Sequence, residues 1–175
     1  MAQIHVVTDS GGDLPLDVRE RLGIHVVPLT VQFGDEIFKD GLEISTTEFY
    51  SRLKEDELIP STCQPSPADF VEMYEKIAQP GDTIISIHLS SQMSGTYQSA
   101  VLASTMIDSA IQVKAIDSKA ASIGIGLVAV AAAEAIQAGK SLDETLDEIQ
   151  HAIDYLQVYF VVDTLEFLQK NGRIG

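Results

Sequence analysis

Short runs of β-branched residues recur along the 175-residue chain, and stretches with helical spacing separate them. Several of these runs, such as residues 24–33 (IHVVPLTVQF), are nearly continuous in apolar residues, without regular alternation between apolar and polar residues. A strand of this kind is buried on both faces, as in a parallel sheet that helices cover on each side. We therefore expect an α/β fold with a mainly parallel sheet and helices on both faces. The expected strands are residues 3–8, 24–33, 83–88, 111–116 and 157–162.

Several helix starts and one turn can be predicted from local patterns. Residues 45–48 and 141–144 fit the capping box, in which a hydroxyl and a carboxylate satisfy free amides reciprocally. In residues 65–70, proline stands near the first turn of an expected helix, where its missing N–H costs no hydrogen bond. Residues 118–139 are apolar almost all round, which predicts a core helix buried on every side. Residues 34–36 favour a hairpin at the edge of the sheet.

The charge balance excludes two classes of partner. The chain has 26 acidic and 11 basic residues, for a formal net charge of −15. Nucleic acids and anionic membrane surfaces are bound through basic faces, so neither is expected as a partner. The single cysteine, Cys63, cannot form a disulfide within the chain; the first residues have neither a basic region nor a long apolar segment, so no secretion signal is expected. We expect a cytoplasmic protein without stable membrane insertion.

Hydroxyl-rich loops follow three of the expected strands. They are residues 8–12, 90–96 and 117–119, and a further segment, residues 61–66, also precedes a helix. Ligands of open parallel sheets bind beyond the carboxyl ends of the strands, and helix N-termini attract anions. Taken singly, such residues are usually N-caps; together they predict a site for an anion or a polar ligand. The candidate residues in the loops after the strands are Asp9, Ser10, Ser91, Ser94, Gly95, Thr96, Asp117 and Ser118.

Three other motifs favour structural explanations. Residues 124–129 match the dinucleotide pattern G-x-G-x-x-A, but they begin inside a predicted helix, where glycines favour close packing instead. His88 lies near several serines, but no G-x-S-x-G elbow is present, and a histidine in a strand is usually a core residue. Cys63 is expected to be an ordinary thiol. No spacing of histidines and carboxylates predicts a metal site.

Several segments, in order and with sensible spacing, together resemble the DegV family, whose members are bacterial fatty-acid-binding proteins with two α/β lobes. At residues 11–12, 63 and 171 the chain departs from the more usual residues of the family. The segments that carry the resemblance are VVTDS with DLP (6–15), HVVPLTVQFGD (25–35), residues 38–41, QPSPADF (64–70), SGTYQSA (94–100), IDSKAAS (116–122), YFVVDTLEFL (159–168) and NGRIG (171–175).

The resemblance implies a non-catalytic protein that buries a long-chain fatty acid and needs no cofactor. By motif, Thr62 and Ser94 would hold the carboxylate, and Arg173 would supply a nearby positive charge. The other candidate residues in the loops would support them. Some family members present the fatty acid to an ATP-dependent kinase partner, which makes acyl phosphate for phospholipid synthesis, so this partner is also expected.

The resemblance also implies a further part of the fold. Family members continue beyond the G-R-I segment into a second lobe, which contributes a histidine to the carboxylate site. We expect residues 1–162 to form an α/β lobe, and residues 163–175 to begin the connection to a second lobe that this chain lacks. Two alternatives remain open: an enzyme or binding protein for a phosphorylated small molecule at the sheet edge, and a chain whose main role is association with the second lobe.

Overall fold

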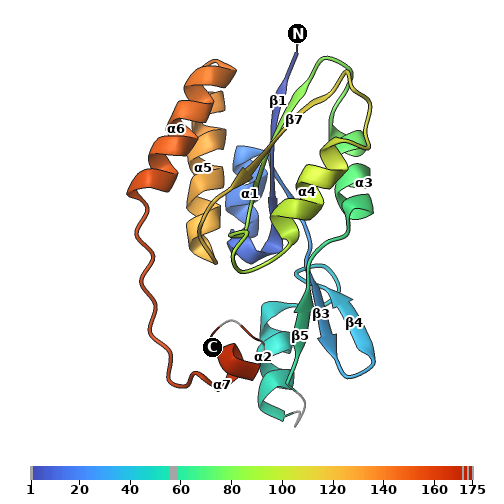
Figure 1. Ribbon diagram of the computed structural model, residues 1–175, viewed down its shortest axis with the longest axis vertical. Coiled ribbons are helices and arrows are strands. Elements are labelled where there is room, and N and C mark those ends of the chain that lie inside the picture. The colour runs from blue at the N-terminus through green and yellow to red at the C-terminus, as the bar shows by residue number, and fades with distance from the viewer. Residues whose placement is uncertain (1, 56–58, 171, 173, 175) are drawn as a thin grey trace.

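The computed structural model describes residues 2–55, 59–170, 172 and 174 (Figure 1). Strands and helices alternate along most of the chain, as expected for an α/β protein. The elements in chain order are β1 (Ile4–Asp9), η1 (Ser10–Gly12), α1 (Leu16–Leu22), β2 (Ile24–Val27), β3 (Thr30–Phe33), β4 (Glu36–Lys39), α2 (Thr46–Glu55), β5 (Ser61–Cys63), α3 (Pro67–Ile77), β6 (Thr83–His88), α4 (Thr96–Ser104), β7 (Gln112–Asp117), α5 (Ile123–Gln137), α6 (Leu142–Tyr155) and α7 (Glu166–Lys170).

A four-stranded parallel sheet forms the centre of the molecule. Its strand order is β2-β1-β6-β7, and every neighbouring pair is parallel. The chain moves outward from β1 in one direction to β2 and in the other to β6 and β7. The crevice where the strand order reverses therefore lies between the carboxyl ends of β1 and β6. The expected parallel sheet is confirmed.

Helices cover both faces of this sheet, as expected, and each face has its own apolar core (Figure 1). Side chains of successive strand residues point to opposite faces, so neighbours along β1 contribute to different cores. Val6 packs with α5 residues such as Val128, whereas Val7 packs with Phe70 and Tyr74 of α3. This two-sided burial is the physical reason for the continuous apolar runs in the strands.

A second, three-stranded sheet has the order β4-β3-β5 and projects from one end of the parallel sheet (Figure 1). The prediction of a single strand over residues 24–33 is therefore wrong. Pro28 has no N–H for a strand ladder, and the N–H of Leu29 donates to Oγ of Ser10 at 3.0 Å. The chain consequently leaves one sheet at Val27 and enters the other at Thr30.

The predicted turn at residues 34–36 does join two antiparallel strands, β3 and β4, within the small sheet. Val31, Phe33 and Ile44 form a separate small core there. The predicted helix starts are also confirmed. Ser66 and Ser141 each form a complete capping box, at α3 and α6, and Oγ of Ser45 accepts from the N–H of Glu48.

The apolar segment 118–139 differs from its prediction in two respects. Its helix, α5, begins only at Ile123, because Lys119 and Ser122 have φ values of 55° and 52°, which no right-handed helix accommodates. The helix is also not buried on every side, since Ile123 and Leu127 are about half exposed. Most of the small residues between them and Gln137 pack onto the sheet.

The predicted strand at residues 157–162 is absent. Within the part of the chain that the structure describes, this segment pairs with no strand, and it follows α6 as an exposed extended stretch. A β-branched run becomes a strand only when a neighbour accepts its backbone hydrogen bonds. Among the described residues, no helix has the length and apolar character that crossing a bilayer requires.

Two glycines of the G-x-G pattern lie in the first turns of α5 and permit close packing. A Cβ on Gly126 would lie 2.5 Å from the carbonyl oxygen of Gly12 and 2.9 Å from Cδ2 of Leu14. A Cβ on Gly124 would lie 3.0 Å from Cγ2 of Val158. The preference for packing over a dinucleotide turn is confirmed, because the pattern lies within the helix and not between β7 and the helix.

Gly126→Ala should destabilise the protein by about 1–3 kcal/mol, because the backbone of Gly12 cannot move away from the new methyl group. Urea unfolding measures this change. Alanine is the better helix former by about 1 kcal/mol, so without this contact the substitution would stabilise the protein. A stabilised variant would show that α5 does not approach η1 this closely.

Candidate functional site

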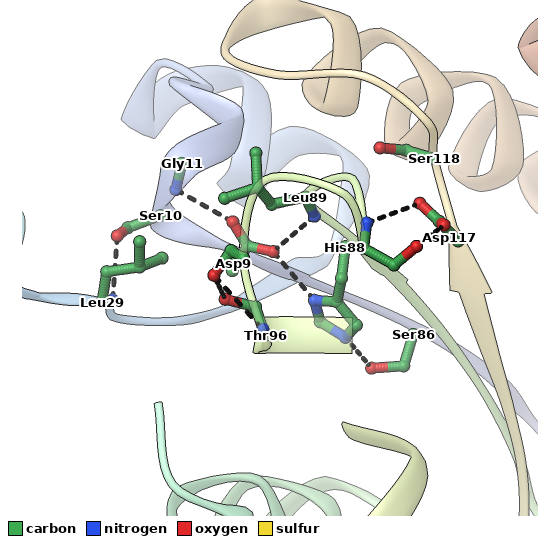
Figure 2. A network of polar contacts seen from close by, with 12 residues as sticks. Asp9, Ser10, Gly11, Leu29, Ser86, His88, Leu89, Thr96, Asp117 and Ser118 are labelled. Atoms are coloured by element: carbon green, nitrogen blue, oxygen red, sulfur yellow. Dashed lines mark hydrogen bonds and ion pairs between the residues drawn. The ribbon is translucent and has the colours of Figure 1, made fainter. Parts of the chain in front are cut away.

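The loops at the carboxyl ends of β1, β6 and β7 meet around the point where the strand order reverses. The side chain that joins two of them is Asp9, the last residue of β1, which is buried (Figure 2). Its Oδ1 accepts from the N–H of Gly11 at 3.1 Å. Its Oδ2 accepts from the N–H of Leu89 at 3.0 Å and faces Nδ1 of His88 at 3.0 Å. One carboxylate thus connects the loop after β1 to the start of the loop after β6.

His88 continues this network into the core. A carboxylate can only accept, so Nδ1 carries the hydrogen that Asp9 receives. On the other side of the ring, Nε2 lies 2.6 Å from Oγ of Ser86, which is in turn 2.8 Å from the hydroxyl of Tyr74. Burial raises the pKa of Tyr74 to about 12, so this phenol stays protonated and can donate. The prediction that His88 is a satisfied core residue is confirmed.

The order Asp9–His88–Ser86 resembles a hydrolase triad in composition but not in accessibility. All three side chains are buried, and Ser86 also contacts Tyr74. A nucleophilic serine must face a substrate, whereas this one lies within the core. The network therefore supports the loops structurally.

A cleft of about 540 Å³ opens between the small sheet and the loop after β6. It brings together Thr62 of β5, Ser94 and Gly95, which come from segments far apart in the sequence. Gly95 is the N-cap of α4 and provides no side-chain cap; beyond the Thr96 N–H, which donates to Oγ of Ser94, the first-turn amides of this helix start beside the cleft. The complete lining is Leu29, Thr62, Cys63, Gln64, Leu89, Met93, Ser94 and Gly95.

Ser94 is held in place by its own loop. Its N–H donates to the carbonyl of Ser90 at 3.1 Å, and its Oγ accepts from the N–H of Thr96 at 3.3 Å. The hydroxyls of Ser94 and Thr96 are 2.9 Å apart, and Thr96 is buried. Thr96 therefore supports Ser94 from below the cleft surface, while Ser94 remains partly exposed.

Ser91 and Asp117 bind each other, and neither lines the cleft. The Ser91 hydroxyl donates to Oδ2 of Asp117 at 2.5 Å, and the Ser91 N–H donates to Oδ1 at 3.2 Å. Burial would raise the pKa of Asp117, but these hydrogen bonds and one from the N–H of Lys119 outweigh it and hold the pKa below its usual value. The pair fixes the loop after β6 to the end of β7.

The remaining predicted residues lie at neighbouring positions. Asp9 and Ser10 border a second cleft beside α1, and Ser10 also holds Leu29 in the lining of the first cleft. Ser118 is buried next to a third cleft, under the segment after α6. Arg173 lies outside the described residues. Of the predicted residues, the structure thus places Thr62, Ser94 and Gly95 in one cleft.

Gln64 lines the same cleft and was missed as a site residue, as were Leu29, Leu89 and Met93. A sequence signal for Gln64 did exist, because it stands two residues after Thr62. Side chains two apart in an extended chain point to the same side. No comparable signal marks Leu29, since its position depends on the break between β2 and β3.

Asp9→Asn should lower the free energy of unfolding by about 3 kcal/mol or more, because the new amide group turns a donor toward N–H groups that need an acceptor. Chemical denaturation measures the loss. Asp13→Asn is the matched control: Asp13 is exposed, an amide oxygen can still accept from the Ser122 hydroxyl, and asparagine tolerates its φ of 49°, so under about 1 kcal/mol is expected. Equal losses in both variants would contradict a special role for Asp9.

Comparisons with known proteins agree on one family. The profile described as "Uncharacterised protein, DegV family" matches residues 3–175. A DegV domain-containing protein of Listeria innocua is 42% identical over 174 residues, which are 99% of this chain and 61% of that protein.

Two solved structures have the same fold. One is a DegV family protein from Thermus thermophilus, described for its fatty-acid binding, with a TM-score of 0.87 and 42% identity over 98% of this chain and 61% of the other. The second is DegV from Bacillus subtilis, described as a fatty acid binding protein, with a TM-score of 0.92 and 37% identity over 99% and 61%. The chain thus spans about 61% of the length of these relatives. The match of the family profile from residue 3 to residue 175 shows that the chain belongs to the DegV family.

Proposed function

We propose that this chain binds a long-chain fatty acid and holds its carboxylate in the cleft between Thr62 and Ser94. The observation that carries the proposal is the composition of the cleft, in which Thr62 and Ser94 line the same space beside the start of α4, whose N-cap residue Gly95 has no side chain to bond its amides. Hydroxyls and helix amides can stabilise an anion without a net positive charge. This suits a chain whose formal charge is −15.

Apolar residues beside these donors suit an acyl chain. Leu29, Leu89 and Met93 line the same cleft, and Met93 also borders the third cleft, of about 350 Å³. That cleft presents the small residues Ala120 and Ala121 together with apolar side chains such as Leu156. Each buried methylene contributes about 0.8 kcal/mol, so the tail supplies most of the affinity and the carboxylate site mainly sets position. In this arrangement the acyl chain extends from the first cleft past Met93 into the third cleft.

The described relatives support the same ligand class, because the proteins from Thermus thermophilus and Bacillus subtilis are both described by fatty-acid binding. From the family resemblance we further propose that Arg173 adds a positive charge near the carboxylate. The protein would not catalyse a reaction itself. It would act in the cytoplasm and present the fatty acid to an ATP-dependent kinase, together with the remainder of a full-length DegV fold.

Thr62→Ala and Ser94→Ala should each weaken oleate binding by about 10-fold, because each removes a hydrogen-bond donor to a charged group. Titration of the purified protein with a fluorescent fatty acid, displaced by oleate, measures the change. Ser104→Ala is the matched control: its hydroxyl donates to the carbonyl of Val101 at the far end of α4, away from the residues that line the cleft, so unchanged affinity is expected.

Thermal unfolding should be unaffected by Thr62→Ala, since Thr62 is exposed. Oleate binding that survives both substitutions at full strength would contradict the carboxylate site. Displacement of the probe by sugar phosphates or nucleotides, but not by oleate, would instead favour a phosphorylated small molecule as the ligand.

A further inference from the structure

The proposed carboxylate site depends on how the two sheets are placed relative to each other. Thr62 belongs to β5 of the small sheet, whereas Ser94 follows β6 of the parallel sheet. The small sheet has a core of its own and is joined to the parallel sheet by the chain crossings after β2 and after β5 (Figure 1). A side-chain contact across the cleft would therefore control the separation of the two hydroxyls.

Gln64 makes such a contact. It follows β5 directly, and its amide lies against the Cα of Gly95 on the opposite side of the cleft. A Cβ on Gly95 would lie 2.5 Å from Nε2 of Gln64 and 2.7 Å from Cδ, and it would also meet Oε1. Nε2 is 3.5 Å from Oγ of the buried Ser99, one turn further along α4. The amide thus occupies the space that a side chain at residue 95 would fill.

Glycine at residue 95 is required for this space and not for its backbone conformation. Its φ of −78° and ψ of 7° are accessible to any residue. The backbone beside Gln64 is held by the buried Pro65 and by Ser66, whose capping box with Asp69 begins α3. The Gln64 side chain itself is exposed and can rotate toward solvent, so a methyl group at residue 95 leaves the helix start intact and displaces the amide from it.

We propose that Gln64, packed against Gly95, is a positioning residue that sets the separation of Thr62 and Ser94 and thereby the affinity for the fatty-acid carboxylate. The inference rests on the proposed function for its ligand, but the contact itself can be tested without one. We call this contact the clasp: the amide of Gln64, which follows β5 of the small sheet, packs on the side-chain-free Cα of Gly95 at the start of α4.

The binding test is a double-mutant cycle. Gly95→Ala should weaken oleate binding by about 10-fold, although it removes no polar group, because the amide can no longer lie on the helix start. Gln64→Ala alone should weaken binding to a similar extent, because it removes the amide itself, and the double variant should bind no more weakly than either single variant, since both substitutions break the same contact. Gln98→Ala removes an exposed glutamine amide from the same helix and should change nothing.

A distance measurement tests the clasp independently of any ligand. In a Cys63→Ser background, spin labels on Ile37→Cys in β4 and Leu102→Cys in α4 report the separation of the small sheet from the helix; both positions are exposed. Gly95→Ala and Gln64→Ala should each lengthen or broaden the distance distribution, and the double variant should show no further change.

Two results would overturn the clasp: an unchanged distance distribution in both Gly95→Ala and Gln64→Ala, or losses of oleate affinity that simply add in the double variant. A different result would overturn the proposed function. If the protein with its original sequence binds no fatty acid while the distances respond as predicted, the clasp stands and its ligand belongs to another class.

Discussion

The buried carboxylate of Asp9 is the interaction on which the architecture of the site depends. It accepts hydrogen bonds from Gly11, His88 and Leu89, and so joins the loop after β1 to the loop after β6 at the reversal point of the strand order. A buried carboxylate is tolerated only when its lone pairs are satisfied. The loop that carries Ser94 therefore starts from a fixed point, and the hydroxyl is held where the cleft opens.

The parallel sheet and most helix starts could be predicted from the sequence, because they depend on local patterns. Continuous apolar runs identify buried strands, and the capping boxes at Ser66 and Ser141 involve residues three apart. The break at Pro28 and the separate small sheet were missed, since they depend on which distant strand accepts each hydrogen bond. Residues 157–162 show the same limit, because β propensity without a neighbouring strand leaves an extended segment.

The sequence predicted which chemical groups the candidate site would contain, but not all of the residues that line the cleft. Hydroxyl-rich loops at strand ends pointed to the edge of the sheet where the cleft opens, yet Ser91 and Asp117 bind each other and Ser118 borders a different cleft. Gln64 stands two residues after Thr62, but its contact with Gly95 became visible only when the structure placed the end of β5 beside the start of α4. Neutral donors around an apolar cleft suit a ligand that gains most of its binding free energy from a buried tail and needs its single charge positioned.

Solvent extraction of the purified protein, followed by mass spectrometry of the released lipid, tests the central claim most directly. Fatty-acid binding at the cleft predicts a near-stoichiometric amount of long-chain fatty acid in the extract, reduced in a protein that carries both Thr62→Ala and Ser94→Ala. A protein that contains no fatty acid, and that takes up none when oleate is supplied in excess, would contradict it.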